Sequence, residues 1–167
     1  MNEWFDKEWL LTNALGGYAS STLCGANTRH YHGLLVAAFK PPTNRILMVA
    51  KVEERVSVHG EDMDLSTNLY PDVVHPDGFK YIQNFEAKPL PKWQYGAAHW
   101  QLEKRICMVQ GSNATLIRYT NSGSETMALE IHPLYAYSDY HAAFHENPAF
   151  DFYSEFANDH IITYATY

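Results

Sequence analysis

The stretch from Glu8 to Phe39 reads EWLLTNALGGYASSTLCGANTRHYHGLLVAAF, and it decides the expected fold and the candidate site together. It holds four glycines, which are typical of tight turns because only glycine accepts a positive φ without steric cost. Residues 34–39 form an apolar run of strand length. Polar side chains on turns that are braced by a buried strand indicate a binding site.

Outward from this stretch, short strand patterns recur along the chain. In residues 45–58, Val52 and Val56 are among the residues on an apolar face, whereas Lys51, Glu53 and Arg55 lie on a polar face, as in a half-buried strand. The expected strands are residues 9–12, 34–39, 45–58, 79–85, 93–95, 100–109, 115–119, 127–131, 150–156 and 160–167, with one more starting near residue 61.

Turn residues separate these patterns. Residues 41–44, 59–60, 111–113 and 121–124 are expected turns, because proline, glycine, asparagine and serine are concentrated there. Residues 70–78 hold two prolines, two aspartates and a glycine and are expected to form a loop, while residues 135–148 follow no regular pattern. No helical period is visible, so the chain is expected to be all-β, an antiparallel β-sandwich with little or no helix.

Composition limits the classes of function. The chain has 167 residues, enough for a single domain over 1–167, and its 12 basic and 19 acidic residues give a net charge of -7. This charge argues against a nucleic-acid partner, which needs a basic surface. No apolar run is long enough for a membrane span, no signal peptide is visible, and two cysteines make no disulfide framework. A cytoplasmic location without metal or cofactor is expected.

The excess of aromatic residues has two interpretations. The chain contains 12 Tyr, 8 Phe and 4 Trp. The side chains of Tyr and Trp combine a flat apolar face with a polar tip. Sugar rings offer the complement, an apolar C–H face and a rim of hydroxyls. Trp93 and Tyr95 are therefore candidates for a sugar-stacking platform, with packing in the core as the alternative.

The opening stretch also carries a family resemblance. The segment TNALGGYASSTLCGANTRHYHGLLVAA resembles the opening motif of the N-terminal domain of prokaryotic glycogen debranching enzymes of the amylo-α-1,6-glucosidase type. Ala14 and His30 stand where the family usually has Gly and Arg. The resemblance continues through LSTNLYPDVVHPDG (65–78), PLPKWQY (89–95), LEKRICMVQGSNATLIRY (102–119) and HPLYAYSDYH (132–141), where Ser138 replaces a commoner Arg.

This resemblance implies both a fold and a parent activity. It implies a β-sandwich of the supersandwich kind placed before an (α/α)6 catalytic barrel, and hydrolysis of α-1,6-linked glucose at glycogen branch points. The catalytic acids of the family lie in the barrel, which this chain lacks. The chain is therefore expected to be a non-catalytic N-terminal portion of a longer enzyme, with an α-glucan and the catalytic domain as its partners.

The run Arg29-His30-Tyr31-His32 is the best candidate for a site. In a strand, His30 and His32 would share one face, which is the beginning of a metal site but needs a third ligand. Bonding to sugar hydroxyls or to a neighbouring domain is favoured over metal. A buried polar network that braces the glycine turns is the structural alternative.

Asp139, Tyr140 and His141 form a second polar-aromatic cluster, suited to binding a sugar hydroxyl. The alternative is a turn in which Asp139 caps its own backbone. Because both clusters are polar-aromatic, sit at strand ends and belong to the blocks of the resemblance, we expect Tyr140 or His141 to lie beside residues 29–32, on one rim of the sandwich.

No catalytic pair of acids stands out. Glu53 and Glu54 are adjacent in an expected strand, so their side chains point to opposite faces. The alternative function is a self-contained sugar-active enzyme, mutarotase-like or metal-assisted, that uses His30, His32 and His141. To act as a nucleophile, Cys24 would need a nearby histidine, for which His30 and His32 are candidates, and an activated thiolate; a small buried cysteine is far commoner.

Residues 161–167 predict association between copies of the chain. This run is β-branched and aromatic, and it contains neither a charged residue nor a proline to protect a strand edge. A homo-oligomer, most simply a two-fold dimer, is therefore expected.

Overall fold

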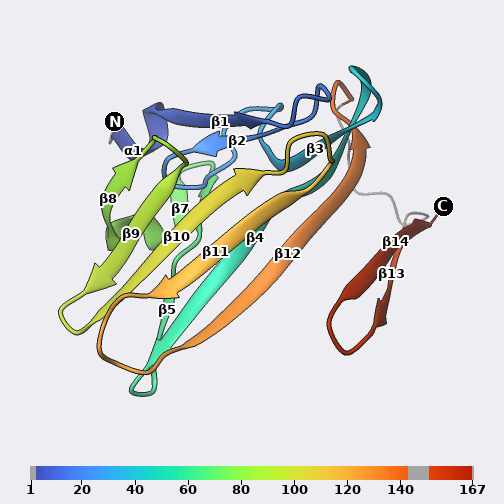
Figure 1. Cartoon of the computed structure of the whole chain (residues 1–167). Coiled ribbons are helices and arrows are strands. Elements are labelled where there is room, and N and C mark those ends of the chain that lie inside the picture. Colours follow the sequence, from blue (N-terminus) through green and yellow to red (C-terminus); the bar gives the residue numbers. More distant parts are fainter. Residues whose placement is uncertain (1–2, 143–150, 167) are drawn as a thin grey trace.

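The computed structural model describes residues 3–142 and 151–166, which are mostly antiparallel strands (Figure 1). The strands are β1 (Glu8–Thr12), β2 (Tyr18–Thr22), β3 (Gly33–Lys40), β4 (Thr43–Val58), β5 (Glu61–Asp64), β6 (Thr67–Tyr70), β7 (Val73–Asp77), β8 (Ile82–Glu86), β9 (Lys92–Ala97), β10 (Trp100–Met108), β11 (Thr115–Asn121), β12 (Ala128–Asp139), β13 (Asp151–Phe156) and β14 (Ile161–Thr166). Helical structure in the described residues is limited to α1 (Glu3–Asp6) and the 3-10 turn η1 (Gly78–Tyr81). The all-β prediction is confirmed.

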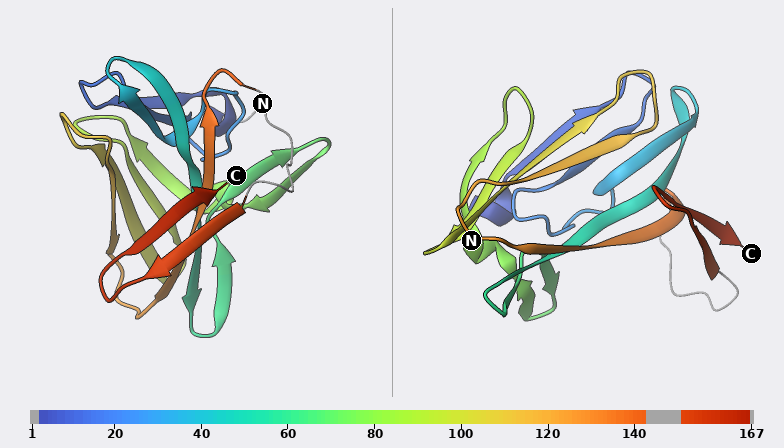
Figure 2. Two further views of the ribbon diagram at one scale, coloured as in Figure 1. Left: turned by 90° about the vertical axis from the view of Figure 1, so that its right-hand side faces the viewer. Right: turned by 60° about the horizontal axis from the view of Figure 1, so that its bottom comes forward.

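Two sheets enclose the core. One has the strand order β1-β2-β3-β4-β12, with β5 also paired to β4, and the other has the order β11-β10-β9-β8. Two hairpins, β6–β7 and β13–β14, pair only within themselves and project from the sandwich (Figure 2). The expected period-2 pattern accounts for the packing, because residues from both sheets, such as Val56 and Ile106, meet in one buried cluster.

Asn13 connects the glycine turn after β1 to the β10–β11 turn of the other sheet. Its side chain is fully buried, and its Oδ1 accepts hydrogen bonds from the backbone N–H groups of Leu15 and Gly17, each at 3.0 Å. Its Nδ2 donates to the Ser112 carbonyl and to Asn113 Oδ1, each at 3.0 Å. One side chain therefore fixes the glycine turn and joins it to the turn that follows β10.

The prediction of a loop over residues 70–78 was wrong. Residues 73–77 form β7, which pairs with β6, and the turn is only Pro71-Asp72. Prolines argue against a central strand but are tolerated in an edge strand, where the missing N–H faces no partner strand. The isolated β6–β7 hairpin offers such an edge to Pro76.

The strand expected for residues 79–85 begins later than predicted. Residues 78–81 form η1, and β8 starts at Ile82. A Cβ on Gly78 would lie 2.1 Å from the Leu65 carbonyl carbon, so only glycine fits this close approach of two backbones. The Phe79 N–H donates to Thr67 Oγ1 at 2.9 Å, which turns the chain away from strand geometry.

The irregular pattern from Tyr135 onward hides a strand. β12 continues to Asp139, with register shifts between Leu134 and Tyr135 and between Tyr135 and Ser138. Such bulges interrupt the alternation by which a strand is found in sequence. The pairing of β3 with β4 has a similar irregularity, because the neighbours Leu35 and Val36 face Val49 and Leu47. The extra residue of β4 is Met48, and Val49 rather than Met48 packs on the core.

The expected strands 150–156 and 160–167 are present as β13 and β14, while residues 143–150 and 167 lie outside the described residues. Among the described strands, β14 pairs only with β13. Several large apolar side chains of this hairpin are exposed, including Phe156, Ile161 and Ile162.

Candidate functional site

The run from Arg29 to His32 forms a turn rather than a strand. The His32 N–H donates to the Arg29 carbonyl at 3.0 Å, which closes the turn. As a result Tyr31 is 48% exposed, whereas His32 is only 4% exposed. The expectation that His30 and His32 share a strand face was wrong, because the segment was treated as extended.

His32 is held as a neutral anchor. Its Nδ1 accepts from the backbone N–H groups of Thr28 and Arg29 at 3.1 and 3.3 Å, so the proton of the neutral ring sits on Nε2. Nε2 lies 3.3 Å from Glu8 Oε1, although the alignment is too poor for a hydrogen bond. Burial lowers the pKa of His32, and Glu8 opposes this shift only in part. Of the alternatives for the run, the buried polar network describes His32.

The two polar-aromatic clusters meet, as predicted. Tyr31 Oη lies 3.2 Å from His141 Nδ1, and the ring centroids of Tyr31 and Tyr140 are 5.6 Å apart. The rings of Tyr140 and His141 are in closer contact, with centroids 3.9 Å apart. With Arg45, these three residues are called the rim cluster. They bring together the turn before β3, the start of β4 and the turn after β12.

Arg45 was missed by sequence reasoning, and it joins the parts of the rim cluster. Its Nε donates to the Gly16 carbonyl at 2.6 Å and its Nη1 to Tyr140 Oη at 3.1 Å. The Tyr18 hydroxyl donates to the Tyr31 carbonyl at 2.8 Å and thereby ties the turn to β2. The glycine turn, β2 and β4 together hold the exposed Tyr31 ring. No local pattern marks Arg45, because its role depends on long-range contacts.

The remaining candidate residues of the two clusters are Asp139, which caps a turn, and Arg29 and His30, which lie on the surface. Asp139 Oδ1 accepts from the His141 N–H at 2.9 Å, so it caps its own turn while it orients His141. Arg29 Nε lies 2.5 Å from Glu8 Oε1 on the surface. The His30 ring meets the Tyr31 ring edge-on, with centroids 5.2 Å apart.

Trp93 and Tyr95 lie in the core, away from the rim cluster. They are 3% and 5% exposed, and Trp93 Nε1 donates to the Leu23 carbonyl at 2.7 Å. Burial raises the pKa of Tyr95 well above its ordinary value. Their rings therefore present no open stacking face, and core packing is the role that the structure displays.

A buried ion pair between the sheets was also missed. Glu54 Oε1 accepts from Lys104 Nζ and, at 2.6 Å, from Tyr119 Oη. The signal was present in the sequence, because each charged residue occupies an inward position of its strand. Glu54 lies between Val52 and Val56, and Lys104 shares the face of Leu102 and Ile106.

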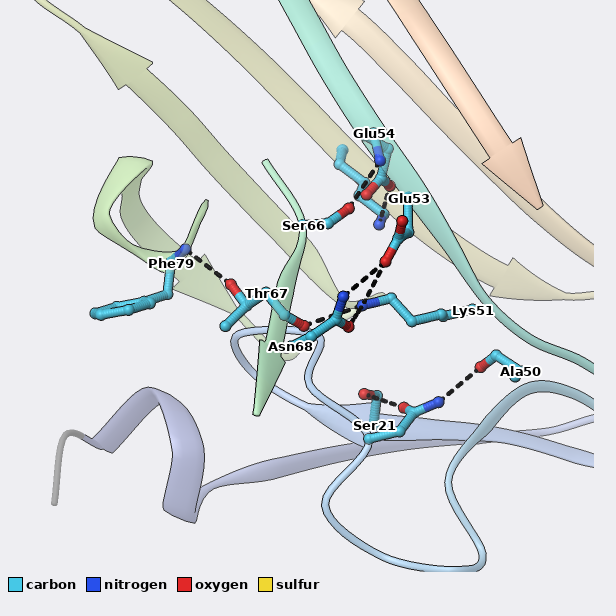
Figure 3. A network of polar contacts seen from close by, with 11 residues as sticks. Ser21, Ala50, Lys51, Glu53, Glu54, Ser66, Thr67, Asn68 and Phe79 are labelled. Atoms are coloured by element: carbon cyan, nitrogen blue, oxygen red, sulfur yellow. Dashed lines mark hydrogen bonds and ion pairs between the residues drawn. The ribbon is translucent and has the colours of Figure 1, made fainter. Parts of the chain in front are cut away.

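A second polar group lies next to this pair, between β4 and β6 (Figure 3). Lys51 Nζ donates to the Thr67 carbonyl at 3.0 Å and to Asn68 Oδ1 at 2.6 Å, and Asn68 Nδ2 donates to Glu53 Oε1 at 2.8 Å. Burial lowers the pKa of Lys51, with Glu53 and Glu54 opposing the shift. The polar face expected for β4 is thus covered here by β6 and internally satisfied.

Three further features bear on the possible kinds of site. Within residues 3–142 and 151–166, no three His, Cys, Asp or Glu side chains are grouped as metal ligands would be. Cys24 is buried, and its Sγ lies 3.2 Å from Thr22 Oγ1. None of the helices in the described part of the chain has the length and apolar character needed to cross a membrane.

The fold and the rim cluster define a class, an antiparallel β-sandwich domain that presents polar and aromatic side chains on one rim. The family described as glycogen debranching enzyme N terminal matches residues 7–167, and the chain belongs to this family. No significant match was found among curated proteins or among solved structures.

Proposed function

We propose that this chain is the non-catalytic N-terminal β-domain of a glycogen debranching enzyme-like protein. In this role it supports an (α/α)6 catalytic domain and contributes to α-glucan binding for hydrolysis of α-1,6 branch points. The family match supports the parent protein. The observation that carries the binding role is the rim cluster, in which the exposed Tyr31 ring contacts His141 and Tyr140, and Arg45 contacts Tyr140.

The chemistry of the rim cluster suits a sugar. The exposed ring of Tyr31 offers a flat apolar face, and its hydroxyl is already polarised by contact with His141. Arg45 and Tyr140 add donors and acceptors at hydrogen-bonding distance from one another. Sugar hydroxyls both donate and accept, and a neutral glucan is not repelled by a chain of net charge -7.

The state of the nearby carboxylates supports a non-catalytic role. Glu8 pairs with Arg29, Asp139 caps its own turn, and Glu54 is buried against Lys104 and Tyr119. Glycoside hydrolysis ordinarily needs two carboxyl groups that flank the scissile bond. The carboxylates at the rim and in the core are instead used for structure.

Calorimetric titration of the purified chain with a branched dextrin tests the proposal. Wild type should bind, and Tyr31→Ala should weaken binding about tenfold, or about 1.4 kcal/mol. Tyr70→Ala removes an equally exposed ring on β6 and is the matched control, expected to bind as wild type does. Equal affinities for Tyr31→Ala and wild type would contradict the role of the rim cluster.

An assay of glucose release separates this proposal from the alternative. The chain alone should release no glucose from the same dextrin. Turnover that disappears on substitution of His30, His32 or His141 would instead establish a self-contained enzyme. Turnover lost on substitution of a single acid would equally contradict a non-catalytic role.

A further inference from the structure

A groove lies between the sandwich and the β13–β14 hairpin, distinct from the rim cluster. Its walls include Phe39, Met48, Tyr135 and Tyr137 from β3, β4 and β12, and Phe152 and Tyr164 from the hairpin. These six residues define the hairpin groove. Its volume is about 320 Å³, whereas the two other hollows described in the molecule have about 40 and 60 Å³. Ligand sites in proteins have about 300–1,000 Å³.

The lining of the hairpin groove specifies the chemistry of its ligand. Aromatic rings dominate the wall, three of them tyrosines, and Thr163 adds another hydroxyl. No lining residue among those described carries a charge, although the whole chain has a net charge of -7. A ligand that matches these walls is neutral, has flat apolar faces and carries hydroxyls. Oligosaccharides have this combination, whereas nucleotides and acidic or basic peptides do not.

The backbone of β12 is irregular at the groove tyrosines Tyr135 and Tyr137. Tyr137 has a φ of 47° and lies in the register shift between Tyr135 and Ser138. A positive φ is uncommon for a bulky residue, and bulges are often found where a strand re-aims side chains beside a site. Across the groove, the rings of Tyr135 and Phe152 have centroids 5.9 Å apart, which brings the two walls together.

The hairpin groove also lies close to the rim cluster along the chain. β12 supplies Tyr135 and Tyr137 to the groove and ends at Asp139, next to Tyr140. Tyr137 and Tyr140 are three residues apart, so their Cα atoms are at most roughly 10 Å from each other. A chain of a few sugar units could therefore contact both places.

We propose that the hairpin groove is a second carbohydrate subsite, which binds a neutral oligosaccharide chain through its aromatic walls. The ligand class follows from the lining of the groove, while its identity as an α-glucan rests on the proposed function. The groove holds a linear part of the glucan, and the rim cluster contacts a neighbouring part.

Titration with maltoheptaose tests the proposal on the full chain. Tyr135→Ala should weaken binding about tenfold, and Tyr135→Phe should weaken it less, because the ring is retained. Phe39→Ala, on the opposite side of β4 from β12, should also weaken binding and provides a second variant if Tyr135→Ala fails to fold. Tyr70→Ala should bind as wild type does. Affinity should be the same at low and high salt, because the groove lining is uncharged.

The outcomes distinguish this proposal from the proposed function. If Tyr31→Ala loses binding while folded Tyr135→Ala and Phe39→Ala bind normally, the proposed subsite in the hairpin groove is overturned. The glucan-binding role of the rim cluster then stands. The reverse pattern would support the groove and remove the glucan role of the rim cluster. Sedimentation provides the last comparison. A wild-type dimer that Phe39→Ala converts to a monomer, with unchanged maltoheptaose affinity, would show that a second copy occupies the groove and would overturn the proposal.

Discussion

Substitution of Lys104 by methionine tests how much the buried ion pair between Glu54 and Lys104 contributes to stability. The side chains of Glu54 and Lys104 are 5% and 13% exposed, so both charges are withdrawn from water. Methionine retains most of the apolar stem and removes only the charge. Glu54 would then keep a single donor, the Tyr119 hydroxyl.

The expected loss of stability follows from this burial. Removing one partner of a buried ion pair destabilises a protein by about 3–5 kcal/mol, because the remaining charge is left uncompensated. Burial and the neighbouring Glu54 raise the pKa of Tyr119, so its phenol stays protonated and still donates. Removal of that hydrogen bond alone, in Tyr119→Phe, should destabilise the chain by about 1.5–3 kcal/mol.

Thermal unfolding followed by circular dichroism measures these effects. For a chain of this length, 1 kcal/mol shifts Tm by roughly 2–4 °C, so Lys104→Met should lower Tm by roughly 6–20 °C. The combined replacement Glu54→Leu/Lys104→Met/Tyr119→Phe removes all three polar side chains of this group. Its Tm should be close to that of wild type or higher. A Tm for Lys104→Met within about 1 °C of wild type would refute the reasoning, because it would mean that water reaches Glu54.

Two further changes test the anchors of the candidate site and of the glycine turn. Burial lowers the pKa of His32 from its ordinary 6.5, so the unfolded chain takes up its proton first as the pH falls, and this loss of stability begins near pH 6.5. Between about pH 7.5 and 5.5, the urea midpoint of wild type should therefore fall more than that of His32→Asn. The control His30→Asn should behave as wild type does. Parallel pH profiles for all three proteins would argue against a buried neutral imidazole. Asn13→Ala leaves two backbone N–H groups without the acceptor they have now, and it should cost at least about 2 kcal/mol in urea unfolding, whereas exposed Asn84→Ala should change stability by less than about 0.5 kcal/mol. Similar losses in these two variants would contradict the role assigned to Asn13.

Much of the fold was determined by local pattern. Strand β10 was found because Trp100, Leu102 and Ile106 alternate with polar residues, and this period of two is a property of any half-buried strand. The meeting of Tyr31 with His141 was also expected, because both belong to polar-aromatic clusters that sit at strand ends within the blocks of the resemblance. Where the period was interrupted, by the bulges of β12, or where proline was taken as a loop signal, in β7, the sequence pattern misled.

Only the tertiary structure decided what each polar residue does. Nothing local to Glu54 or Lys104 announces a partner, although each sits at an inward position; the pair exists because two strands that are distant in sequence face each other. His32 and Tyr31 are neighbours in the chain, yet the turn buries one and exposes the other. The physical reason is common to both cases. Alternation specifies which face a side chain occupies, whereas charge pairing, burial in a turn and the walls of the hairpin groove depend on what the folded chain places opposite that face.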